Sequence, residues 1–167
     1  GNETTKNLIG NGLRTLIQHP EQIQQLRDNP DLMDATIEEL LRFDSPVQLD
    51  RRFALEDVEI GGQQIRKGQS VLLLIGAANR DPDEFEEPDR LDFARARQSH
   101  ISFGRGIHHC LGAALARMES QIAFTKLLER YSDIQFDQRP RHRDHIVLRG
   151  LESLPVRVQR QRITEHI

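Results

Sequence analysis

The stretch Phe103-Gly104-Arg105-Gly106-Ile107-His108-His109-Cys110-Leu111-Gly112 decides the fold assignment of this chain. It holds the only cysteine, in a glycine-rich loop just before a long helical pattern. Glycines let a backbone turn tightly and approach a flat partner closely. The start of a helix offers unpaired N–H groups and a positive dipole end, and both favour a thiolate at Cys110. A thiolate on such a loop is typical of an axial ligand of haem iron.

Composition narrows the class of protein. The chain has 167 residues, enough for one ordinary domain, and a net charge of -3, which gives no basic signal for nucleic acid. A single cysteine excludes an internal disulfide and fits a reducing compartment, so we expect a cytoplasmic protein. We expect no membrane span, because no apolar run approaches the roughly 20 residues that a span requires.

The spacing of apolar residues predicts helices at residues 4–18, 21–27, 31–43 and 111–130. Proline stops the first three, after His19, Asn29 and Ser45. Strand patterns are predicted over residues 47–53, 58–60, 64–65, 71–75 (as a buried strand), 134–136, 146–148 and 154–158. A long loop over residues 79–102 indicates a functional segment. We expect one domain over residues 1–158 and a polar, frayed tail over residues 159–167.

Two pairs of polar residues stand out besides the cysteine loop. Glu39 and Arg42 lie three apart on one helix face, a spacing that most often gives a surface ion pair. Glu3 and Thr4 place an acid beside a hydroxyl, which can relay a proton through water but more often caps a helix.

The cysteine loop resembles the haem-binding loop of the cytochrome P-450 family at Phe103, Gly106, Cys110 and Gly112. The resemblance runs from the first residue to about Val158 and is closest to soluble bacterial members. It implies an α+β, mainly α fold that forms the carboxyl-terminal half of the family fold. The expected parts are the end of the distal helix, the Glu-x-x-Arg helix, small β-sheets, the meander loop, the cysteine loop and the long proximal helix. A complete member is more than twice as long, so Gly1 is expected to fall inside the distal helix.

The resemblance also implies a haem-thiolate monooxygenase that carries haem b. Cys110 is the expected axial ligand of the iron, and Glu3 and Thr4 are expected to deliver protons. Arg52 and His108 are expected to bind the haem propionates, and His100 to lie on the propionate side. The loop residues around the haem are Phe103, Gly104, Gly106 and Gly112.

The Glu39–Arg42 pair corresponds to the family's Glu-x-x-Arg signature, which locks its helix to the long loop. Arg90 is the expected third member of that charge network.

The implied partners are a ferredoxin-type redox protein and a small organic substrate. Arg105, His109 and Arg117 are candidates for the redox-partner surface. The candidates for contact with substrate are Val47, Gln48, Leu49 and Asp50.

Two alternatives stay open. The first is a catalytically inactive, truncated remnant that acts as a globular, self-associating domain without haem, with Leu8, Leu13 and Ile37 expected to lack their usual packing partners. The second is a zinc module built from His100, His108, His109 and Cys110, although adjacent histidines on an extended loop suit one metal poorly.

Overall fold

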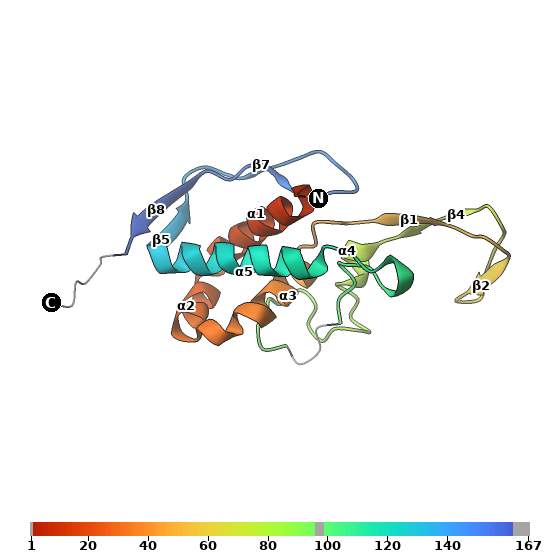
Figure 1. The fold of residues 1–167 in the computed structure, drawn as a ribbon, viewed down its shortest axis with the longest axis horizontal. Coiled ribbons are helices and arrows are strands. Elements are labelled where there is room, and N and C mark those ends of the chain that lie inside the picture. Colours follow the sequence, from red (N-terminus) through yellow and green to blue (C-terminus); the bar gives the residue numbers. More distant parts are fainter. Residues whose placement is uncertain (1, 96–98, 162–167) are drawn as a thin grey trace.

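The computed structural model describes residues 2–95 and 99–161. A helical layer forms its centre: α1 (Glu3–Gln18), α3 (Met33–Phe43) and α5 (Ala113–Arg130) contact one another, and α2 (Pro20–Asp28) contacts α1. A 3-10 turn, η1 (Pro30–Leu32), joins α2 to α3. Figure 1 shows α5 lying across the other helices. The helices α1, α2, α3 and α5 confirm the helical pattern predicted from the sequence, and a proline follows shortly after each of α1, α2 and α3.

The core lies between α1, α3 and α5. Gly12 permits the close approach of α1 to α5, because a Cβ at this position would lie 2.7 Å from the Phe124 ring. Leu8 and Ile37 are buried inside this core, so the expectation that they lack packing partners is wrong. The other buried apolar members of the cluster are Leu16, Leu26, Leu40, Leu41, Leu91, Phe93, Phe124 and Leu128.

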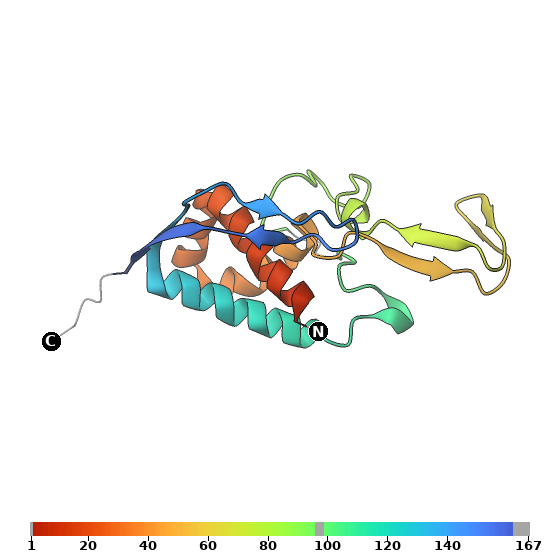
Figure 2. The same ribbon diagram turned by 90° about the horizontal axis from the view of Figure 1, so that it is seen from above.

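The strands form antiparallel pairs around the helices. β1 (Asp50–Phe53) pairs with β4 (Ser70–Leu73), and β2 (Val58–Ile60) pairs with β3 (Gln63–Ile65). Together they make an arm that extends away from the helices (Figures 1 and 2). β5 (Tyr131–Phe136) pairs with β8 (Val156–Arg160), and β6 (Arg141–His142) pairs with β7 (Leu151–Ser153). The hairpin of β6 and β7 lies beside α1 in both views.

Several predicted boundaries are wrong. β4 ends at Leu73 and a short helix, α4 (Ile75–Ala78), follows, so residues 71–75 are not one buried strand. Leu72 is half exposed because β4 pairs in a two-stranded ribbon on the arm, and Leu74, between β4 and α4, is also half exposed. Residues 146–148 form no strand: Leu148 makes an isolated bridge to Val47.

The chain also departs from the predictions near its described end. Pro155 cannot donate to a ladder and lies between β7 and β8, so the strand predicted over 154–158 begins at Val156. Residues 159 and 160 belong to β8 rather than to a frayed tail, and residues 162–167 lie outside the described residues. The strand predicted over 47–53 begins at Asp50, and α5 begins at Ala113 rather than at residue 111.

The loop after α4 follows the sequence prediction. In the described part of the chain it contains turns and bends, but neither helix nor strand, as far as the 3-10 turn η2 (Gly106–His108). Within residues 2–95 and 99–161, none of the helices has the length and apolar character needed to cross a membrane.

Candidate functional site

The loop from Phe103 to Gly112 presents the Cys110 thiol next to the start of α5. The Cys110 amide donates to the Phe103 carbonyl at 2.8 Å, and the Ala113 amide donates to the Cys110 carbonyl at 3.2 Å. Gly104 and Gly106 have φ values of 69° and 64°, in the left-handed region that favours glycine. Two of the predicted glycine positions are therefore required by the path of the loop.

Cys110 borders a cavity of about 360 Å³. The wall is largely apolar, and its members come from α1, the end of α3, α4, the cysteine loop and α5. The thiol itself is exposed, and Gly112 presents no side chain beside it. Apolar lining residues include Leu8, Leu41, Val47, Ile75, Phe103 and Ala116. A thiol facing apolar walls fits the expected planar, largely apolar group with an iron ligated by sulfur.

Charged groups occupy another part of the same cavity. Asp50, Arg52 and His108 all border it, and the Arg52 Nη1 donates to the Asp50 Oδ2 at 2.6 Å. This hydrogen bond, with a smaller contribution from His108, lowers the pKa of the Asp50 carboxyl. Arg52 and His108 therefore lie where a carboxylate-bearing ligand could contact them, with Asp50 as a competing partner of Arg52.

The Glu3 and Thr4 side chains do not lie at the same site. Thr4 borders the cavity, whereas Glu3 forms an ion pair with Arg143 and is not among the cavity residues. Gly1, the first residue of the expected motif, lies outside the described residues.

His100, expected on the propionate side, is not among the residues that border the cavity at Cys110. Its buried ring lies 3.0 Å from the Glu38 Oε2 through Nε2, and its Nδ1 accepts from the Ser102 amide at 3.2 Å. The Nε2 contact joins the long loop to α3, and the Nδ1 contact lies within the loop.

Glu38 links His100 to Arg117 of α5, a connection that the sequence did not reveal. Arg117 donates to both carboxylate oxygens of Glu38, at 2.5 and 2.9 Å, and its guanidinium lies 4.6 Å from the centre of the Phe103 ring. Burial raises the pKa of Glu38, but the hydrogen bonds from Arg117 and His100 outweigh it and lower the pKa to about 2. The cluster joins α3, α5 and the cysteine loop.

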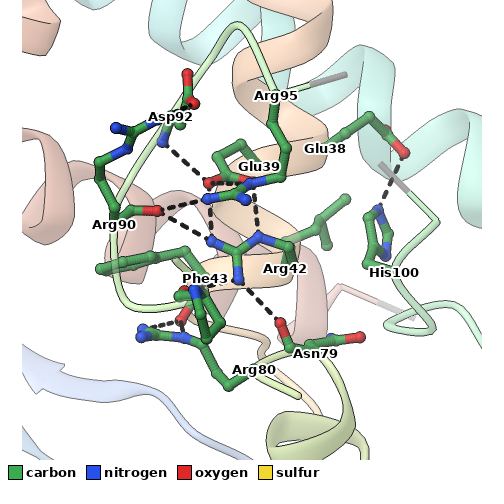
Figure 3. Close-up of polar contacts among 12 residues, drawn as sticks. Glu38, Glu39, Arg42, Phe43, Asn79, Arg80, Arg90, Asp92, Arg95 and His100 are labelled. Carbon is green, nitrogen blue, oxygen red and sulfur yellow. Dashed lines mark hydrogen bonds and ion pairs between the residues drawn. The ribbon is translucent and has the colours of Figure 1, made fainter. Parts of the chain in front are cut away.

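Glu39 and Arg42 form the centre of a buried network (Figure 3). Arg42 donates to Glu39 through Nε and Nη2, and its Nη1 donates to the carbonyls of Asn79 and Pro88. The side chains are 1% and 0% exposed, so this is not a surface ion pair. The expected lock between the helix and the long loop is present.

Arg95, rather than Arg90, supplies the third charged side chain. Its Nε lies 3.3 Å from Glu39 Oε1 and its side chain is 8% exposed. The Arg90 side chain is 59% exposed and pairs with Glu87 and Asp92, and only its carbonyl accepts from Arg42, at 3.3 Å. The prediction for Arg90 is therefore wrong, since its side chain points to solvent.

The residues predicted to contact substrate or the redox partner do not form a single site. Val47 and Asp50 border the cavity at Cys110, but Gln48 borders a different one and donates to the Ser45 carbonyl. In the proposed partner surface, His109 is exposed and Arg105 donates to the Ser99 carbonyl. Arg117 is engaged by Glu38, so it offers less free charge than expected.

The histidines near Cys110 do not gather around a common point. Across residues 2–95 and 99–161, no group of three or more His, Cys, Asp or Glu side chains has the arrangement of a metal site.

Comparison with known proteins adds independent information. The family model described as cytochrome P450 matches residues 1–152. The biotin biosynthesis cytochrome P450 of Bacillus subtilis is 50% identical over 93% of this chain and 40% of its own length, and cytochrome P450 CYP107DY1 of Priestia megaterium is 48% identical over 93% of this chain and 38% of its own length. The chain thus spans about 40% of the length of such relatives.

Solved structures agree with these relatives. P450BioI, solved in complex with an acyl carrier protein carrying hexadec-9Z-enoic acid, superposes with a TM-score of 0.92 at 49% identity, over 94% of this chain and 41% of that one. The tirandamycin C-bound P450 monooxygenase TamI gives a TM-score of 0.91 at 43% identity, over 95% and 41% of the two chains. The predicted fold class, a mainly α part of the P450 fold, is confirmed, and this chain belongs to the cytochrome P450 family.

Proposed function

We propose that this chain is the haem-binding portion of a haem-thiolate monooxygenase. The observation that carries the proposal is the position of Cys110, whose thiol borders an apolar-walled cavity on a loop with two left-handed glycines. When bound, haem b would supply the activation of dioxygen that places one oxygen atom in a small organic substrate and releases the other as water. The two electrons would come from a ferredoxin-type partner in the cytoplasm.

The chain's own groups have separate roles in this proposal. The Cys110 sulfur would be the axial ligand, with Phe103 and Ala116 among the apolar residues at its end of the cavity. Arg52 and His108 would bind the propionates, and Arg52 would exchange its bond to Asp50 for one to a propionate. Val47 would contact substrate, and the Thr4 hydroxyl would hand on protons, with Glu3 contributing only after leaving Arg143.

One observation favours the second candidate, a self-associating domain without haem. Leu115, Met118 and Ile122 lie at helical spacing on α5 and are all at least half exposed, and Ile107 and Leu111 nearby are fully exposed. Contiguous apolar surfaces of this kind promote association.

Haem titration separates the two candidates. The purified chain is mixed with haemin, reduced and exposed to carbon monoxide, with Cys110→Ser as the variant and Ser132→Ala as a distant control. The proposal expects the red-shifted ferrous–CO band of thiolate-ligated haem in the wild type and the control but not in Cys110→Ser. Sedimentation of a haem-free, colourless oligomer in every sample would instead support the self-associating domain.

A further inference from the structure

A second cavity, of about 540 Å³, contains several cationic side chains and shares no lining residue with the cavity at Cys110. Arg14 enters it from α1, Arg80 from the start of the long loop and Arg149 from the segment before β7. Asp44 and Ser45, directly after α3, form another part of the wall. This site lies outside the proposed haem chemistry and does not depend on it.

The charges in this cavity do not balance. Arg149 Nε donates to Asp44 Oδ1 at 2.5 Å, while Arg14 Nη1 lies 3.6 Å from Asp44 Oδ2, too far for a hydrogen bond. One carboxylate thus faces two guanidinium groups. The Arg80 guanidinium already has partners, since it donates to the Phe43 carbonyl and to Asp89.

The excess of positive charge also affects the pKa of His142, which lies near these arginines. Burial lowers its pKa most, and Arg149 and Arg14 lower it further, against a smaller opposing effect of Asp44.

Polar atoms without partners also surround this cavity. Within the described ranges, the Arg14 guanidinium and both Nη atoms of Arg149 make no hydrogen bond. The Asp44 Oδ2 and Ser45 Oγ are buried and have no hydrogen-bond partner there. The Arg14 and Arg149 side chains are 23% and 43% exposed, so among these described groups only the two buried oxygens lack any partner. A buried polar group without a partner is costly, so a bound molecule that reaches these two oxygens would be stabilised. That molecule needs several acceptors for the arginines and one donor for Asp44.

We propose that this cavity binds a phosphate group that carries one proton, either as free phosphate or as a monoester. Arg14 and Arg149 would donate to its oxygens, as guanidinium groups commonly do. Its P–OH would donate to Asp44 Oδ2, and Ser45 Oγ would donate to a further oxygen. Free phosphate keeps at least one P–OH at neutral pH, whereas a monoester, whose second pKa is about 6, keeps its P–OH only on the acid side of that value.

Asp44 gives the site a preference that a simple basic patch lacks. Sulfate has the same shape as phosphate but carries no proton near neutral pH, so its oxygens would face Asp44 Oδ2 without a hydrogen bond. The site should therefore bind phosphate more tightly than sulfate. Arginine side chains alone would distinguish the two anions only by their charge.

Calorimetric titration of the whole chain with inorganic phosphate, phenyl phosphate and sulfate tests the proposal, at constant ionic strength and at about pH 5, where both phosphates carry a P–OH. We expect phosphate to bind at least about tenfold more tightly than sulfate, and Arg14→Gln to weaken phosphate binding by about tenfold or more. Arg157→Gln, on β8, alters an exposed pair with Asp137; it is the matched control and should bind as the wild type does. Phenyl phosphate binding as tightly as phosphate would identify a monoester site, and exclusion of phenyl phosphate would identify a site for the free ion.

Asp44→Asn is the diagnostic variant. An amide can donate to an oxyanion, so the preference for phosphate over sulfate should disappear while sulfate binding tightens. If Asp44→Asn does not fold, Arg149→Lys replaces it and should weaken phosphate binding about tenfold, because the paired Nη donors are lost. Absence of saturable phosphate binding, equal binding of sulfate by the wild type, or a preference that survives Asp44→Asn would overturn the proposal.

Discussion

Arg42 and Glu39 form a bidentate ion pair inside the protein, with Arg42 Nε 2.7 Å from Glu39 Oε2 and Arg42 Nη2 2.8 Å from Glu39 Oε1. Both side chains are excluded from water, so each charge depends on the other. Removing one partner leaves an uncompensated buried charge.

Glu39→Ala should lower the free energy of unfolding by about 3–5 kcal/mol for this reason. Urea unfolding measured by circular dichroism checks the value. Glu59→Ala, on the exposed strand β2, is the control and should unfold at the wild-type urea concentration. Equal midpoints for the two variants would show that the buried pair adds nothing to stability.

Arg95→Ala and Arg90→Ala distinguish the two arginines of the long loop. Arg95 contacts Glu39 and donates to the carbonyls of Glu86 and Arg90, so its loss should cost about 2 kcal/mol. Arg90 pairs at the surface, and its removal should leave the melting temperature unchanged. A larger loss in Arg90→Ala than in Arg95→Ala would restore Arg90 to the network.

Glu38 should make the free energy of unfolding depend on pH in the acid range. Its pKa in the folded chain is about 2, below the ordinary value of 4.5, so the folded state favours the ionised carboxylate. The stabilisation is complete above pH 4.5 and is lost as the pH falls from there towards 2.

Glu38→Gln should remove this part of the pH dependence. Urea midpoints for the variant and the wild type should converge as the pH falls through that range. A constant difference between them at every pH would mean that the Glu38 carboxylate has no special partner in the folded state.

Two glycines of α1 should respond in opposite directions to alanine. At Gly10 a Cβ would meet only Leu151, at 4.0 Å, so Gly10→Ala should gain up to about 1 kcal/mol of helix propensity. At Gly12 a Cβ would lie 2.7 Å from the Phe124 ring and 3.0 Å from Leu40, so Gly12→Ala should lose about 1–3 kcal/mol through overpacking. Thermal unfolding of both variants measures the contrast, and a shift in the same direction for both would refute it.

The local parts of this fold are readable from the sequence. Apolar spacing locates α1, α3 and α5, proline marks the ends of α1 and α3, and the glycines of the cysteine loop indicate its turns. The end of β4 was not readable, because Val71 to Ile75 is a continuous apolar run with no breaker where the helix α4 begins.

The ion-pair partners were not readable either. Arg90 and Arg95 are alike in sequence, and only the path of the loop decides which side chain turns inward to Glu39. His100 and Arg117 likewise lie far along the chain from Glu38, and no local pattern links them.

Arg42 and Arg95 hold the long loop mainly by its backbone. Their guanidinium groups donate to the carbonyls of Asn79, Glu86, Pro88 and Arg90, and every amino acid supplies a carbonyl. The side chains at positions 86 and 90 can therefore drift during evolution, even in charge, while the loop keeps its course. The course of the loop thus depends on Arg42, Arg95 and Glu39, and little on the side chains at the positions whose carbonyls the arginines bind.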